Sequence, residues 1–157
     1  MNTHIIIEFI SLFFAGMLAG IETVIHYGIR KPTELLDEKP QIELRQAMIL
    51  RLRWLVPAFF VPTALTAIVV TVLEHSKQGA VFLYAGLLAI VVWILVRVLG
   101  TVRINSATIE WSATTPPKDW KQQIASSERF HIVGTWAAIL AFIFFLIATA
   151  MRLHGNG

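Results

Sequence analysis

The apolar positions of this chain fall into four long runs that are separated by polar segments. The runs cover residues 5–27, 54–73, 80–99 and 130–151. At about 1.5 Å per residue, a helix over each run is long enough to cross a hydrocarbon layer of about 30 Å. The connection 74–79 is short, so its two flanking helices should be antiparallel neighbours. The pattern predicts an all-α integral membrane four-helix bundle, a single domain over residues 1–157.

Proline and threonine predict where helices begin and bend. Pro57 and Pro62 lie inside the second run and predict a kink near its start. Pro40 should begin a helix that continues into this run. Thr115 stands directly before Pro116, an order typical of a helix N-cap with proline in the first turn. We therefore expect the fourth helix to begin near Pro116.

The basic residues predict the orientation of the bundle. Eleven lysines and arginines fall on the side reached by the end of the first run, and two fall on the other side. The positive-inside rule then places the segments 28–53 and 100–129 in the cytoplasm as loops and both termini on the non-cytoplasmic side. We expect a location in a bacterial inner membrane. The same clustering explains the isoelectric point of 9.6 without a nucleic-acid partner.

Composition and missing motifs exclude several classes of protein. Charged residues make up 15% of the chain, against about a quarter in soluble domains. The chain contains no cysteine, which excludes disulfides, thiolate catalysis and iron–sulfur ligation. It lacks a nucleophile elbow, a phosphate-binding glycine loop and an HExxH motif, so a hydrolase or a nucleotide-driven machine has no support. Four spans without an inverted repeat also argue against a transporter.

Two glutamate–histidine pairs are the main candidates for chemistry. Glu22 and His26 lie four residues apart at the end of the first run, and Glu128 and His131 lie three apart where the fourth begins. Helical spacing puts each pair on one face, and the topology brings both to the cytoplasmic side. Carboxylates and imidazoles in a bundle suit a metal, here iron or copper, or acid–base chemistry. All four are therefore candidate metal ligands.

Each pair also has a simpler interpretation, which stays open. Glu22 could lie at the interface and pair with one of three arginines, Arg51, Arg53 or Arg97. The second pair could be only the polar start of a helix. At the non-cytoplasmic side, the polar residues are interpreted as solvated interface residues: His4, Glu74, His75 and His154.

Further polar and aromatic residues follow these pairs. Asn105 comes two helical turns after Arg97 and one after Thr101, so the three share a face if the third helix continues. Asn105 could hold a substrate oxygen or orient a ligand, or it could cap the helix. Three tryptophans could line an aromatic pocket or anchor the protein at the membrane surface: Trp54, Trp111 and Trp120. Helical spacing from Trp120 to His131 would lay Trp120 over the mouth of the bundle.

This layout resembles the anthrone-oxygenase-like family of small four-span membrane proteins. The resemblance rests on three stretches: the first run ending in Glu22 and His26, the segment Arg51-Leu52-Arg53-Trp54, and the stretch Asn105…Trp111…Pro117…Trp120…Glu128-Arg129-Phe130-His131. The chain departs from the family pattern at Ser127, where tryptophan is usual, and at Gly134, where arginine is usual. The resemblance implies oxygen-dependent oxidation of an anthrone-like aromatic compound to a quinone.

From the sequence we therefore expect a membrane oxidoreductase or oxygenase that takes a lipophilic aromatic substrate from the bilayer. The resemblance implies functional positions at Glu22, His26, Asn105 and His131, and His131 or Glu22 would be the base if no metal acts. The expected substrate-binding residues are Arg51, Arg97, Trp54, Trp111 and Trp120. The alternatives are an accessory subunit that packs through Gly16 and Gly20, and a binder of a small ligand. The same small-residue face would allow homo-oligomers.

Overall fold

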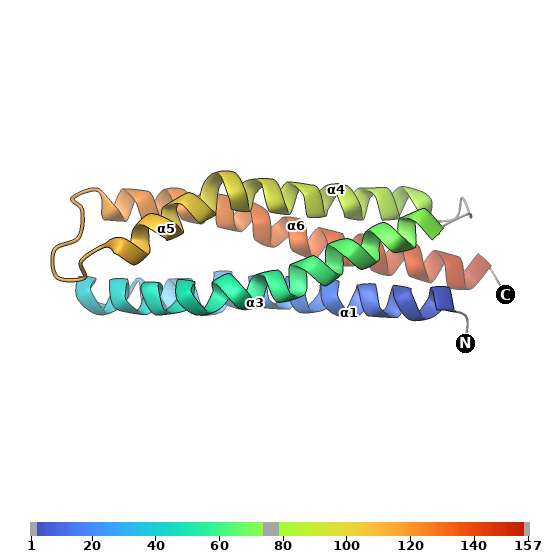
Figure 1. Cartoon of the computed structure of the whole chain (residues 1–157), viewed down its shortest axis with the longest axis horizontal. Helices are drawn as coiled ribbons and strands as arrows, with labels where there is room; N and C mark the ends of the chain where they lie inside the picture. Colours follow the sequence, from blue (N-terminus) through green and yellow to red (C-terminus); the bar gives the residue numbers. More distant parts are fainter. Residues whose placement is uncertain (1–2, 74–78, 156–157) are drawn as a thin grey trace.

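The computed structural model describes residues 3–73 and 79–155, and this part of the chain is helical, without strands. Its elements are α1 (Thr3–Thr23), the π-helical segment η1 (Val24–Arg30), α2 (Lys31–Thr33), α3 (Glu38–Leu73), α4 (Ala80–Val96), the π-helical segment η2 (Arg97–Val102), α5 (Arg103–Glu110) and α6 (Trp120–Gly155). They form a bundle with both termini at one end (Figure 1).

Four helices in the described residues are long and apolar enough to cross a membrane. They are His4–Thr33, Glu38–Leu73, Ala80–Glu110 and Trp120–His154. Large apolar side chains on their outer surfaces are exposed, among them Phe13, Val72, Val81 and Leu99. Such a surface suits hydrocarbon better than water. The predicted all-α bundle with four candidate spans is confirmed.

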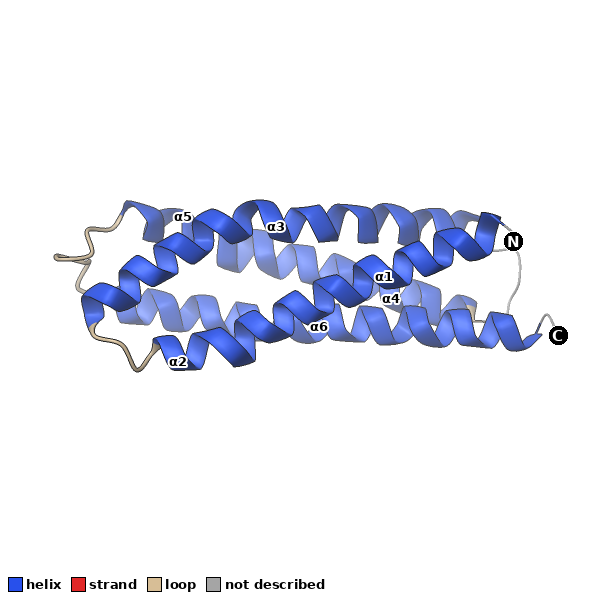
Figure 2. Cartoon of the chain, turned by 90° about the horizontal axis from the view of Figure 1, so that it is seen from below, coloured by secondary structure: helices blue, strands red, loops and turns tan. Residues whose placement is uncertain are grey.

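The segments predicted as loops are mostly helical. Within them, only residues 34–37 and 111–119 lie outside helices, and both gather at the end of the bundle opposite the termini (Figure 2). Residues 38–53 are rich in strong helix formers such as glutamate, leucine, arginine and glutamine, so the second helix extends well beyond its apolar run. The prediction that a helix from Pro40 continues into the second run is confirmed.

The predicted start of the fourth helix near Pro116 is wrong. Residues 116 and 117 lie in the loop, and α6 begins at Trp120, whose backbone N–H donates to the Pro117 carbonyl (3.0 Å). Proline disfavours the helical conformation in the residue before it, so Pro117 keeps Pro116 out of a helix. At the observed helix start, the side-chain Nε2 of Gln123 donates to the Asp119 carboxylate (3.0 Å).

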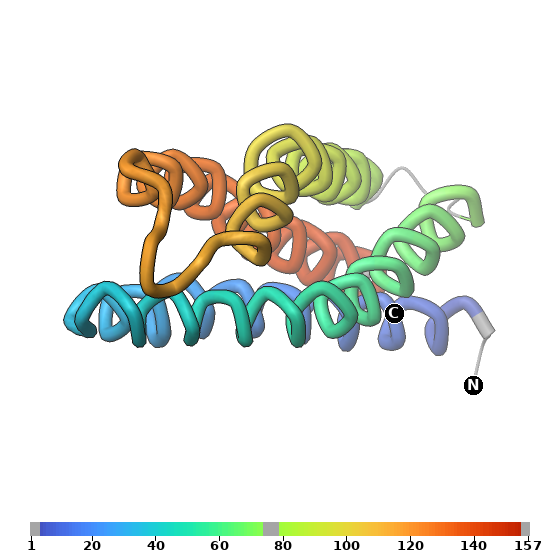
Figure 3. The backbone as a smooth tube through the Cα atoms, turned by 60° about the vertical axis from the view of Figure 1, so that its left-hand side comes forward, coloured from blue at the N-terminus to red at the C-terminus, as the bar shows by residue number. Residues whose placement is uncertain are grey.

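Pro57 and Pro62 lie inside one continuous helix, α3. In Figures 1 and 3 the helix changes direction in the section that contains them. Each proline removes a backbone donor from the helix, which explains the bend. The bend carries the second half of α3 across the bundle.

Small residues let α6 pack closely against α1 and α4. The core contains Ala15 of α1 and four alanines of α6, namely Ala137, Ala138, Ala141 and Ala148. Gly86 and Gly100 leave no room for a Cβ atom, because the rings of Phe145 and Phe130 lie directly on them. This close packing holds the residues described next in fixed positions.

Candidate functional site

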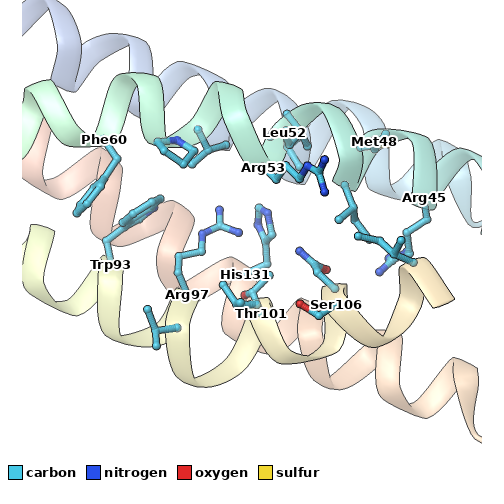
Figure 4. Close-up of a pocket in the computed structure, with 18 of the residues that line it drawn as sticks. Arg45, Met48, Leu52, Arg53, Phe60, Trp93, Arg97, Thr101, Ser106 and His131 are labelled. Carbon is cyan, nitrogen blue, oxygen red and sulfur yellow. The ribbon is translucent and has the colours of Figure 1, made fainter.

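A cavity of about 460 Å³ lies between α3 and the continuous helix formed by α4, η2 and α5. Figure 4 shows its wall, with Arg97 and His131 pointing into the space. Its volume is in the range of small-molecule sites. No aspartate or glutamate of the described residues lines it. Its polar lining residues are Arg30, Thr33, Arg45, Arg53, Arg97, Thr101, Asn105, Ser106 and His131.

One side of the cavity is a stripe of residues at four-residue spacing. Trp93, Arg97, Thr101 and Asn105 all line it, because residues four apart share a helix face. The predicted shared face of the last three is therefore confirmed. Trp93 was missed, although it lies one turn before Arg97. Both π-helical segments contribute lining residues, and such segments often occur at functional sites.

Glu22 is the polar centre behind this wall. Its side chain is fully buried, and it forms an ion pair with Arg97. Trp93 Nε1 lies 3.2 Å from Oε1, and Thr135 Oγ1 lies 3.5 Å from Oε2. A buried carboxylate needs such partners, because its desolvation cost is otherwise not offset. The sequence left open which arginine Glu22 would pair with, and in the structure it pairs with Arg97.

His131 connects Glu22 with the cavity. The residue is 2% exposed, and its Nδ1 lies 3.3 Å from Thr135 Oγ1 and 3.8 Å from Glu22 Oε2. Nε2 is therefore the ring nitrogen left to meet a molecule in the cavity. His26 stacks on this ring, with 5.9 Å between centroids, but does not itself line the cavity. A carboxylate behind an imidazole is an arrangement suited to a general base.

Glu128 belongs to a different cluster from the other candidate ligands. Its Oε1 lies 3.0 Å from Arg45 Nη2 and 3.6 Å from Arg30 Nη1. In the described residues, no three histidine, aspartate or glutamate side chains are placed to hold a metal ion. Arginines occupy the positions beside both carboxylates, and their charge repels a cation. The predicted ligand set does not fit a metal centre in this conformation, and we derive no step through a metal.

The three predicted pocket tryptophans lie outside the cavity lining. Trp54 is 73% exposed on the outer surface of α3. Trp120 packs with Ile42, Ile124 and the partly buried Trp111 in a small apolar cluster. The aromatic part of the cavity wall comes instead from inside the spans. Phe60 stacks on Trp93, with ring centroids 4.6 Å apart.

The arginines of the cavity also differ in part from the prediction. Arg97 lines it as expected, whereas Arg51 is exposed and lies outside the lining. Arg30, Arg45 and Arg53 were not expected there. All three lie in the segment 28–53, which was predicted as a loop, and the helix expected from Pro40 does not by itself show which way Arg45 and Arg53 point. The helix-forming composition of residues 38–53 was the available signal for Arg45.

Gly134 of α6 faces the helix that carries Arg97. A Cβ atom at this position would lie 3.6 Å from Arg97 Nε. The space beside position 134 is thus next to an arginine from the neighbouring helix. A guanidinium is present at this place even though residue 134 is glycine.

A second polar cluster lies at the end of the bundle that carries the termini. The buried Glu8 forms an ion pair with Arg152, and His4 Nδ1 lies 2.7 Å from both Glu8 Oε1 and Arg152 Nη2. The interpretation of His4 as a solvated residue is wrong, because α1 and α6 hold it against these charges. His154 is exposed. The other two residues of that prediction, Glu74 and His75, lie outside the described residues.

The fold and site define a helical bundle with four candidate membrane spans and one arginine-lined, partly aromatic cavity. No known protein-family model, curated protein or solved structure matches this chain.

Proposed function

We propose that this protein is a membrane-embedded oxidoreductase that uses O₂ to oxidise a lipophilic, weakly acidic aromatic compound of the anthrone or quinol type. The observation that carries the proposal is the position of His131. Its ring faces a largely apolar cavity, with the Glu22 carboxylate behind it and the Arg97 guanidinium beside it. This combination supplies a base and a site for the resulting anion.

In the proposed reaction, the aromatic rings lie against Trp93 and Phe60, and the substrate oxygen faces Arg97 and Asn105. Nε2 of His131 removes a proton from the ring CH₂ group, and Arg97 stabilises the negative charge that moves to the oxygen. O₂ then oxidises the anion. For a substrate of the anthrone type, CH₂ and O₂ overall give C=O and H₂O, so one oxygen atom enters the product and the other leaves as water.

The same helices support a proposed location. Their exposed apolar surfaces and the distribution of basic residues support a bacterial inner-membrane protein with the cavity on the cytoplasmic side. Arg53 is exposed and also lines the cavity, so it marks the mouth. A lipophilic substrate would enter there from the bilayer.

The test is an oxidation assay in lipid nanodiscs. The wild-type protein should convert anthrone to anthraquinone, with matching O₂ consumption, faster than empty nanodiscs do. His131→Ala should lose this excess rate, and His4→Ala, at the other end of the bundle, should keep it. A wild-type rate equal to that of empty nanodiscs would refute the proposal for this substrate class.

A second candidate is a non-catalytic accessory or ligand-binding component of a larger membrane complex. The pairing of both Glu22 and Glu128 with arginines favours it, since paired charges also serve structure alone. The surface for such assembly, or for a homo-oligomer, would be Gly20, which has open space around it. Gly16 already packs on Phe142 within the chain. This candidate predicts binding without turnover.

A further inference from the structure

We propose that the arginine-rich part of the cavity binds an anionic group, a carboxylate or a phosphate, on an amphipathic ligand. The apolar part of this ligand would lie against Trp93 and Phe60. This inference adds to the proposed function a preference for substrates that carry such a group, and it rests on that function only in treating the ligand as a substrate. The binding itself can be tested separately.

The charges around the cavity do not balance. Four arginines line it, Arg30, Arg45, Arg53 and Arg97. Two carboxylates contact members of this set from behind: Glu22 pairs with Arg97, and Glu128 pairs with both Arg30 and Arg45. Neither carboxylate lines the space. Among the three less exposed arginines one positive charge thus remains in excess, and the exposed Arg53 adds another at the mouth. Both favour an anion in this part of the cavity.

Several polar atoms of the cavity wall lack hydrogen-bond partners. Arg30 Nη1 is buried and lies 3.6 Å from Glu128 Oε1, which is too long for a hydrogen bond. Thr101 is 2% exposed, and its Oγ1 is also unpartnered, as is Arg97 Nε. Buried polar groups nearly always have partners, so these three are unsatisfied donors in residues that line the cavity. Carboxylate or phosphate oxygens accept from all three kinds of donor.

The cavity is polar at one end and aromatic at the other. In Figure 4, Arg45 and Arg53 lie on one stretch of α3, and the stacked pair of Phe60 and Trp93 lies farther along the bundle. Arg45 and Phe60 are 15 positions apart in the same helix, roughly 22 Å along its axis. An inorganic anion would fill only the arginine end. An amphiphile with an anionic group would fill both.

The test compares four probes on the full chain purified in an uncharged detergent: dodecanoate, dodecyl phosphate, dodecanol and inorganic phosphate. Both amphiphilic anions should bind at least about tenfold more tightly than dodecanol, because hydrogen bonds to charged groups are strong. They should also bind more tightly than inorganic phosphate, which lacks the chain. Equal binding of dodecanol and dodecanoate would overturn the inference.

Variants locate the binding site. Arg30→Gln should weaken dodecanoate binding by about tenfold and leave dodecanol binding unchanged. Arg53→Gln, at the exposed mouth, provides a second test that does not disturb a buried ion pair. The control is Arg129→Gln, an exposed arginine outside the lining at a neighbouring position to Glu128. Loss of affinity in the control that equals the loss in both test variants would contradict the assignment.

A competition measurement distinguishes a lipid headgroup from a free amphiphile as the source of the anionic group. A comparison of turnover with binding distinguishes this inference from the oxidation proposal. Competition by phosphatidylglycerol nanodiscs, but not by phosphatidylcholine nanodiscs, would identify a lipid headgroup as the occupant; no competition would identify a free amphiphile. If the oxidation proposal fails and this one holds, the wild type shows no turnover yet prefers anions. If only the anion-binding inference fails, the wild type oxidises anthrone but binds dodecanoate and dodecanol equally.

Discussion

The two ends of the bundle contain the same three residue types in different surroundings. In each, a buried glutamate of α1 contacts an arginine and lies near a histidine. We name them the cavity triad, Glu22–Arg97–His131, and the terminal triad, Glu8–Arg152–His4. In both cases the arginine comes from another helix, so each triad joins α1 to the rest of the bundle.

The difference between the triads is the space beside them. The cavity triad adjoins about 460 Å³, whereas the space beside Glu8 is about 10 Å³, hardly enough for one water molecule. The larger cavity also has an aromatic wall and unpartnered donors, including Arg97 Nε. A buried ion pair alone therefore does not identify a functional site. It becomes a candidate when a ligand-sized space lies beside it.

Replacing the histidine of each triad by alanine should give the largest difference between the two triads in oxidation rate. His131→Ala should lower the enzymatic rate by about 10²–10⁴-fold, the usual contribution of a general base. His4→Ala should leave the rate within about twofold of the wild type, since the terminal triad lies at the other end of the bundle. Quinone formation in nanodiscs measures both. Equal losses would indicate that the two histidines act through stability, and the proposed role of His131 would be wrong.

The glutamates should behave alike in stability and differently in function. Glu22→Gln and Glu8→Gln each leave a buried arginine without its carboxylate, which typically costs about 3–5 kcal/mol. Unfolding by sodium dodecyl sulfate from mixed micelles measures this free energy. Under conditions where both variants remain folded, only Glu22→Gln should lose turnover. A fully stable Glu22→Gln variant would show that the ion pair with Arg97 contributes little to the fold.

The sequence predicted the helices of this bundle better than their ends. Apolar runs identify spans because hydrocarbon requires about twenty apolar residues. Apolar runs alone do not show that a helix continues into polar sequence, as α3 does before Trp54; Pro40 was the signal for that extension. The Pro-Pro pair before α6 was interpreted as a helix start, although the steric effect of Pro117 on Pro116 favours a loop. That error moved the expected start by four residues.

The candidate site was predicted in part. Arg97, Asn105 and His131 line one cavity, and Glu22 pairs with Arg97 behind its wall, because each lies on an inward helix face that spacing reveals. Glu128 was predicted to join these residues, but it lies in a separate cluster with Arg30 and Arg45. One sequence does not show how far apart the faces of different helices lie. The π-helical segments were also not predictable, and each turns the residues that follow it.

Close helix contact on the cavity side should depend on Gly100. Gly100→Ala places a methyl group into the ring of Phe130, so it should destabilise the protein by about 1–3 kcal/mol, as overpacking does. Gly20→Ala is the matched control, because its Cβ atom would meet nothing within 4 Å. The same unfolding assay measures both. If Gly20→Ala proves the more damaging, that surface is packed against another chain, which would favour the accessory-subunit candidate.

The smallest effect should come from the contact that closes the cavity at its loop end. Gln46 Nε2 of α3 donates to the carbonyls of Thr108 and Trp111, each at 2.9 Å, and so ties the end of α5 to α3. Gln46→Leu keeps the size of the side chain and removes these bonds, at a cost of about 0.5–1.5 kcal/mol. Hydrogen exchange should speed up in residues 103–110 and stay unchanged around the terminal triad, because the lost bonds join α5 to α3 and the terminal triad lies at the opposite end of the bundle. Faster exchange at both ends would mean that the bundle opens as one unit, and the two triads could then not be treated as independent.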